Sequence, residues 1–86
     1  MSELRVQVKL FATLRHFAPD GIGIGESFTV EVEEGWTVKE LISHLNIPID
    51  SAKLIMIEGV HQTLDFVLKD ENATVAIFPP VGGGYR

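Results

Sequence analysis

The chain has 86 residues, which favours a single domain, and it contains no cysteine, which excludes disulfide bonds and thiolate metal sites. With 45% hydrophobic residues it is too apolar for an intrinsically disordered protein, while a formal charge of −5 disfavours nucleic acid and suits either solubility or a basic protein partner. No apolar run approaches a membrane span and the N-terminus has no signal-peptide pattern, so we expect a cytoplasmic protein without a membrane partner.

The first part of the chain predicts two antiparallel strands. Apolar and polar residues alternate over residues 4–10 and again over 28–33, the pattern of strands with one buried face. Phe11 continues the first pattern but falls on its polar face. Residues 21–25 carry glycine at every second position. We interpret them as a flexible connection and not as a nucleotide-binding loop, because a strand follows them where such a loop requires a helix.

The middle of the chain predicts one helix. Thr37 and Glu40 have the spacing of a capping box, in which each side chain accepts a hydrogen bond from the other residue's backbone. Apolar residues then follow at helical spacing, at Val38, Leu41, Ile42 and Leu45. We expect Asn46 and Pro48 to end this helix.

The last part predicts three short strands, over residues 54–57, 60–64 and 74–78, of which we expect the first to be buried. Pro79 and Pro80 stop the last strand because proline cannot donate a ladder hydrogen bond. The element order predicts an α+β protein in which one helix covers one face of a mixed sheet, compatible with the β-grasp fold. We expect residues 1–80 to form this domain and residues 81–86 to be a flexible glycine tail.

Three segments resemble one family in the same order along the chain. They are residues 6–15 (Val-x-Val-x-Leu-Phe-Ala-x-Leu-Arg), 37–41 (Thr-Val-x-Glu-Leu) and 75–84 (Val-Ala-Ile-Phe-Pro-Pro-Val-x-Gly-Gly). Together they resemble the MoaD/ThiS family of ubiquitin-like sulfur carriers. The double proline and the Phe-Ala-x-Leu-Arg segment favour MoaD, the small subunit of molybdopterin synthase, over ThiS of the thiamine pathway. The resemblance implies a ubiquitin-like β-grasp fold.

The resemblance also implies how such a carrier works. An E1-like enzyme, of the MoaB, MoeB or ThiF type, uses ATP to adenylate the carboxylate of Gly84, and a sulfur donor converts it to a thiocarboxylate. A MoaE-type large subunit then uses the sulfur, so the carrier is a non-catalytic subunit that binds no cofactor itself. The tail residues implied are Pro79, Pro80, Val81, Gly82 and Gly83. Glycine suits a narrow channel because it has no Cβ.

Two residues after Gly84 depart from the family pattern. With Tyr85 and Arg86 attached, the Gly84 carbonyl is an amide and cannot be adenylated. Three explanations are open: a protease removes both residues, Arg86 itself supplies the carboxylate, or the protein no longer carries sulfur. We prefer removal by a protease.

The resemblance further implies interface residues. Phe11 and Phe78 match apolar partner contacts in MoaD, and His61 lies where the family presents an interface side chain. A lone histidine without a second ligand nearby predicts no metal site. Alternative functions are a carrier for thiamine or another product, and a β-grasp module that binds partners without covalent chemistry. The genes beside this one would distinguish the two carrier functions: pterin-synthesis genes would favour MoaD, and thiazole-synthesis genes would favour a thiamine carrier.

Overall fold

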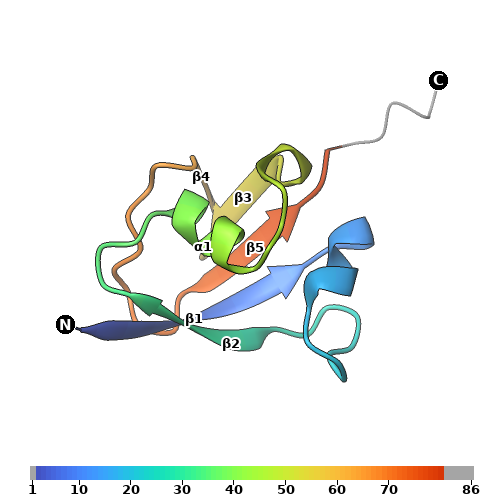
Figure 1. Ribbon diagram of the computed structural model, residues 1–86, viewed down its shortest axis with the longest axis horizontal. Coiled ribbons are helices and arrows are strands. Elements are labelled where there is room, and N and C mark those ends of the chain that lie inside the picture. Colours follow the sequence, from blue (N-terminus) through green and yellow to red (C-terminus); the bar gives the residue numbers. More distant parts are fainter. Residues whose placement is uncertain (1, 81–86) are drawn as a thin grey trace.

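The structure, a computed structural model, describes residues 2–80, and this part forms one mixed sheet with a single α-helix against one of its faces (Figure 1). The elements are β1 (Glu3–Leu10), the 3-10 helix η1 (Ala12–Phe17), β2 (Phe28–Glu33), α1 (Val38–His44), the 3-10 helix η2 (Ile49–Ser51), β3 (Leu54–Ile57), β4 (Val60–Gln62) and β5 (Thr74–Phe78). The predicted α+β class is confirmed. The tail predicted over 81–86 lies outside the described residues.

The sheet joins two hairpins, β1–β2 and β3–β4, through its central strand β5. Its five strands lie in the order β2-β1-β5-β3-β4, and the pairing is antiparallel except between β1 and β5. In the parallel pair, Val8 lies opposite Val75, while in the first hairpin Val6 lies opposite Val30. The mixed sheet predicted from the element order is therefore present, and α1 crosses between the two hairpins (Figure 1).

An entirely apolar core lies between α1 and the sheet. The residues of β1, β2 and β5 are buried at every second position, as their alternation predicts. The largest fully buried side chains are Leu14, Leu41, Ile42, Leu68, Ile77, Val6, Val8, Val32, Val38 and Val75. Among residues 2–80 no polar or charged side chain is buried, so apolar contact is what holds the helix on the sheet.

Both ends of α1 are closed by the residues that predicted them. The Thr37 side chain accepts a hydrogen bond from the Glu40 N–H (3.3 Å), and the Glu40 carboxylate accepts one from the Thr37 N–H (2.8 Å). At the other end Asn46 adopts a left-handed conformation (φ 65°), and the Ile47 N–H donates to the Ile42 carbonyl (3.1 Å). This is a Schellman ending, with Ile42 and Ile47 both buried beneath it.

Two predicted strands differ from those observed. The strand predicted over 60–64 ends at Gln62, because the chain turns at Thr63 and the Leu64 carbonyl accepts from Lys39 of α1 (2.9 Å). The segment 54–57 is a strand but is not wholly buried, since Leu54 is 38% exposed. A continuous apolar run does not say which of its residues face the core.

The remaining segments agree with their predictions. Residues 21–25 connect η1 to β2, with Gly21 and Gly25 at positive φ (92° and 78°), and the Gly23 N–H donates to the Glu26 side chain (2.8 Å). A strand does follow them, as expected of a connection.

Within the described part of the chain, no helix is long and apolar enough to span a membrane.

Candidate docking surface at the end of β5

The face of the sheet opposite α1 is divided into a polar half and an apolar half. On β1 and β2 the outward side chains are polar or charged, as the alternating pattern of these strands requires. On β5 the inward residues are Val75 and Ile77, so Ala76 and Phe78 point outward and are half-buried. On β3 the outward residues are Leu54 and Met56. The apolar half therefore covers the outer side of β3 and β5.

Phe11 and Phe78 form the centre of the apolar half. Their rings are stacked, with centroids 4.4 Å apart and planes inclined by 7°. The Phe11 N–H donates to the Ile77 carbonyl (3.3 Å), which holds Phe11 beside β5 after β1 has ended. Leu54 lies opposite Phe78 on β3, so Phe78 has an apolar neighbour on each side. We call Phe11, Leu54, Met56, Ala76 and Phe78 the Phe11–Phe78 patch.

A second row of side chains crosses the sheet next to this centre. Lys9 lies opposite Ala76, Ala76 opposite Met56, and Met56 opposite His61. The row thus begins with a lysine and ends with an exposed histidine. Although the whole chain has a charge of −5, the patch is bordered here by Lys9 and, at the start of β3, by Lys53. A partner that fits the patch therefore has an apolar surface bordered by acidic groups. The net charge of the whole chain suggests the opposite, a partner with a basic face.

A hollow of about 460 Å³ lies beside the stacked rings, where β5 ends. It is lined by Phe11, Ala12, Lys53, Leu54, Phe78, Pro79 and Pro80. The Lys53 N–H donates to the Phe78 carbonyl (2.9 Å), so backbone pairing continues to the residue before the prolines. Pro79 is half-buried and Pro80 is exposed. The two prolines therefore leave the sheet at the edge of the patch, and their rings fix φ at positions 79 and 80.

Ala12 has the backbone conformation that turns the chain away from β1 here. Its φ is 54°, a left-handed conformation that costs a residue with a Cβ about 1–2 kcal/mol. The turn begins η1, whose Leu14 is buried, and it leaves Phe11 outside the strand and against Phe78. Ala12 and Leu14 belong to the first of the three resembling segments, so part of that motif serves to place Phe11.

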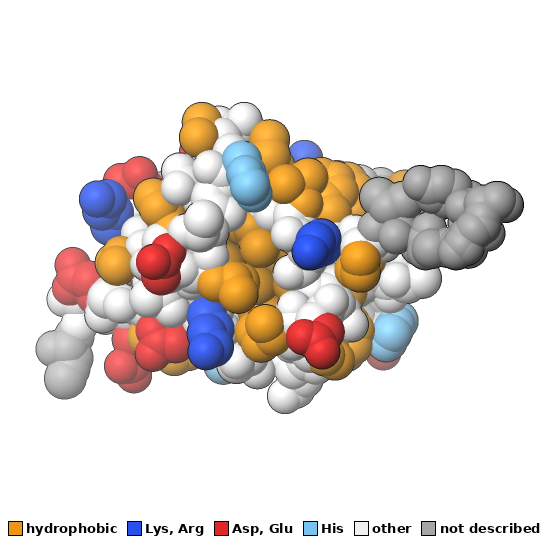
Figure 2. Space-filling view, turned by 90° about the horizontal axis from the view of Figure 1, so that it is seen from above, with side chains coloured by type: hydrophobic (Ala, Val, Ile, Leu, Met, Phe, Trp, Pro, Cys, Tyr) orange, Lys and Arg blue, Asp and Glu red, His pale blue; other side chains and the backbone are white. Residues whose placement is uncertain are grey.

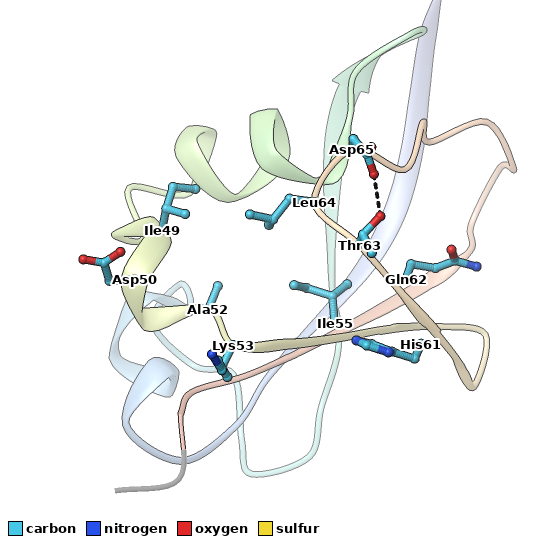
Figure 3. Close-up of a pocket in the computed structure, with 10 residues that line it drawn as sticks. All are labelled: Ile49, Asp50, Ala52, Lys53, Ile55, His61, Gln62, Thr63, Leu64 and Asp65. Carbon is cyan, nitrogen blue, oxygen red and sulfur yellow. Dashed lines mark hydrogen bonds between the residues drawn. The ribbon is translucent and has the colours of Figure 1, made fainter. Parts of the chain in front are cut away.

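His61 lies apart from the stacked rings and borders a second hollow, of about 770 Å³. Figure 3 shows Ala52, Ile55 and Leu64 pointing toward one another in its middle, with His61 and Lys53 at its rim. Thr63 donates to the Asp65 carboxylate on another side. Residues 2–80 contain no group of three His, Asp or Glu side chains placed to hold a metal ion. His61 therefore borders this hollow and, as the cross-strand partner of Met56, also ends the row of outward side chains.

The structure brings together some of the predicted site residues. Phe11, Phe78, Pro79 and Pro80 meet at one hollow, whereas His61 lies at the far end of the neighbouring row. Val81, Gly82, Gly83 and Gly84 lie outside the described residues. Leu54, Met56 and Ala76 were not predicted from the sequence as part of this site. The available signal was that the outward positions 54, 56, 76 and 78 are all apolar. Figure 2 shows hydrophobic side chains exposed over much of the face seen from above Figure 1.

Three solved structures share the fold of this chain. The chain is similar to the solution structure of the HVO 2177 protein of Haloferax volcanii (TM-score 0.72, 19% identity, covering 95% of this chain and 88% of that one). It is also similar to a putative molybdopterin converting factor, subunit 1, from Pyrococcus furiosus (0.65, 26%, 91% and 99%) and to SAMP1 of Haloferax volcanii (0.63, 22%, 93% and 99%).

These structures confirm the β-grasp fold, and a search of curated protein sequences found no match. The model of the ThiS family matches residues 8–84, which include the stacked phenylalanines, both prolines and the glycines. The match therefore covers most of the sheet together with the segment that follows it. The predicted resemblance is confirmed, and the chain belongs to the ThiS family.

Proposed function

We propose that this protein is a sulfur carrier whose Gly84 becomes a C-terminal thiocarboxylate. The observation that carries the proposal is the family match, which extends through Gly84 and joins the glycines to an apolar patch at the end of β5. A carrier needs a tail that enters an enzyme and a folded surface that the enzyme holds. The Phe11–Phe78 patch supplies such a surface, because interfaces centre on packed aromatic anchors.

The chemistry requires no titrating group of the carrier itself. In an E1-like partner, an oxygen of the Gly84 carboxylate attacks the α-phosphorus of ATP, pyrophosphate leaves, and an acyl-adenylate forms. A hydrosulfide anion from the sulfur donor then attacks the acyl carbon, AMP leaves with the pair of electrons of the broken C–O bond, and loss of the S–H proton gives the thiocarboxylate. The resulting thiocarboxylate sulfur is the nucleophile that a second partner hands to its substrate. The catalytic residues belong to the two partners.

The geometry limits how far the reacting carbon lies from the docking surface. Four residues from 81 to 84 can reach about 14 Å when fully extended. A partner that grips the Phe11–Phe78 patch must therefore have its adenylation or sulfur-transfer site within that distance of Pro80. The alignment of patch and prolines at the end of β5 favours an entry in which the tail continues the direction of the strand.

We propose molybdopterin synthesis as the pathway, with a MoaE-type subunit as the second partner. The support is the likeness, at 26% identity, to a protein described as molybdopterin converting factor subunit 1, together with the Phe-Ala-x-Leu-Arg segment and the double proline. Synthesis of thiamine or another sulfur-containing product is the alternative. In a strain that lacks the gene, failure of molybdenum enzymes with normal growth without thiamine would support molybdopterin synthesis and refute the thiamine role, whereas active molybdenum enzymes would refute molybdopterin synthesis.

Tyr85 and Arg86 must be removed for this chemistry, and we propose a protease that cleaves after Gly84. The test is the intact mass of the protein isolated from its own cells. A species without the two residues, part of it heavier by the exchange of one oxygen for sulfur, is the expected result. A full-length species alone, in cells that are making the cofactor, would refute processing and favour a non-covalent binding module.

The variant Gly84→Ala, with Gly23→Ala as its control, distinguishes a sulfur carrier from a module that only binds partners. Under the carrier function, Gly84→Ala abolishes thiocarboxylate formation and cofactor synthesis. Gly23 is a matched control in the fold, since a Cβ there would lie 3.4 Å from the flexible Glu26 side chain. If the Gly84 variant supports synthesis as well as the control does, the reacting group is not at this position.

A further inference from the structure

One long edge of the sheet has no partner among the described residues. β2 is the outermost strand on its side and pairs only with β1. The Glu34 N–H donates to the Ser2 carbonyl (2.9 Å), which fixes the phase of the ladder. Because bonded and non-bonded pairs alternate in antiparallel strands, the pairs at Val32, Val30 and Phe28 carry the ladder hydrogen bonds. The pairs between them do not.

The backbone groups of the intervening residues therefore point away from the sheet. These residues are Thr29 and Glu31, and no hydrogen bond within residues 2–80 reaches their outward N–H and carbonyl groups. The side chains agree with this phase, since Gln7 donates to the Thr29 hydroxyl across the pair (3.0 Å), as close side chains of a non-bonded pair do. At Glu33 the carbonyl already accepts from Trp36 (3.0 Å).

A hollow of about 520 Å³ runs beside this edge, between β2 and the end of α1. Its apolar lining comes from Phe17, Phe28, Val30 and Leu45, and His44 lies at its border. A strand placed next to β2 would direct every second side chain toward this hollow and the others toward the outer face. This edge of the sheet therefore offers free backbone N–H and carbonyl groups to an added strand, and an apolar groove that every second side chain of that strand would enter.

The outer face beside the edge is acidic. Glu31 and Glu33 are exposed there, and Glu3 lies opposite Glu33. Arg5 lies opposite Glu31 but is hydrogen-bonded and ion-paired to Glu71 (2.8 Å). Side chains that an added strand directs to this face would therefore meet uncompensated negative charge. Lysine or arginine at those positions would be attracted, and opposite charges across neighbouring strands are stabilising.

We infer that β2 is a second docking site, separate from the Phe11–Phe78 patch, for an extended segment of a partner protein in which apolar and basic residues alternate. The segment adds a strand to the sheet through Thr29 and Glu31, a mode in which backbone hydrogen bonds give affinity and alternate side chains give specificity. A second copy of this chain does not fit, because antiparallel pairing of two β2 strands centred on Glu31 sets glutamate against glutamate.

The probe is a blocked seven-residue peptide, Val-Lys-Val-Lys-Val-Lys-Val, titrated into isotope-labelled full-length protein. We expect the amide resonances of Thr29 and Glu31 to shift and their hydrogen exchange to slow. A peptide with glutamate in place of every lysine should bind at least about 10-fold more weakly at low salt. Glu31→Pro removes an outward N–H that the ladder does not use, and should weaken binding of the lysine peptide by at least about 10-fold.

Glu31→Ala is the matched control, because it keeps the N–H and removes only the charge, so it should weaken binding less than Glu31→Pro does. The inference is overturned if about 1 mM lysine peptide shifts neither amide. It is also overturned if the shifts fall on β4 or on the Phe11–Phe78 patch, or if both peptides bind equally. Amide shifts at Thr29 and Glu31 that depend on protein concentration without peptide would identify a second copy as the occupant and refute it as well.

Discussion

The stacked pair Phe11 and Phe78 gives the sharpest test of how the Phe11–Phe78 patch is held together. Replacing a fully buried phenylalanine by alanine costs about 3–5 kcal/mol. Phe11 is half-buried, so we expect Phe11→Ala to lower the free energy of unfolding by about 2 kcal/mol. For a domain of this size that is a fall in Tm of about 8–16 °C. Urea denaturation followed by far-UV circular dichroism measures the change.

A double-mutant cycle isolates the contact between the two rings. With centroids 4.4 Å apart and nearly parallel planes, Phe11→Ala and Phe78→Ala should be coupled by about 0.5–1.5 kcal/mol. Phe66 is the control, since it is also a half-buried phenylalanine but packs against the core beneath the start of α1. Its coupling to Phe78 should stay below about 0.5 kcal/mol. Equal coupling in the two cycles would refute the view that the stack holds Phe11 in place.

Three further predictions concern stability. Thr37→Ala breaks the capping box and should lower the free energy of unfolding by about 1 kcal/mol in the same urea assay, and a loss below about 0.3 kcal/mol would contradict it. Asn46→Val places a β-branched residue at φ 65° and should cost about 1–2 kcal/mol, whereas Asn46→Gly should be tolerated; equal stability of the two variants would argue against the left-handed ending. Glu71→Gln should change stability by less than about 1 kcal/mol, because the ion pair with Arg5 is largely exposed; a larger loss in a thermal melt would show that the pair is structural.

The elements that the sequence predicts well are those whose signal is local. The alternation over residues 4–10 identifies β1, because each buried residue there meets the same core. The capping box identifies the start of α1, since the hydrogen bonds that form it join two residues only three positions apart, Thr37 and Glu40. Asn46 identifies the end of α1 because its left-handed conformation is set within the last turn of the helix. None of these inferences depends on where distant segments lie.

The Phe11–Phe78 patch depends on contacts that no local pattern contains. Phe11 falls on the polar face of its strand in the sequence pattern, yet the chain has left the strand by Ala12 and the ring rests on Phe78. The two residues are far apart in the sequence and meet only because β1 and β5 are parallel neighbours. For the same reason the outward position of Leu54 could not be told from an apolar run alone. The family resemblance named the two phenylalanines, and the fold explains why they are adjacent.

The central position of β5 has a consequence for the order in which the molecule assembles. Among the strands of residues 2–80, β5 comes last along the chain, yet it joins the β1–β2 hairpin to the β3–β4 hairpin. Its pairing with β1 closes a long loop, and contacts of large sequence separation form slowly. A nascent chain that lacks β5 has two unconnected hairpins and no neighbour for Phe11. The patch and the prolines therefore come together only in the finished sheet, so a protein that bound both would distinguish the folded chain from an incomplete one.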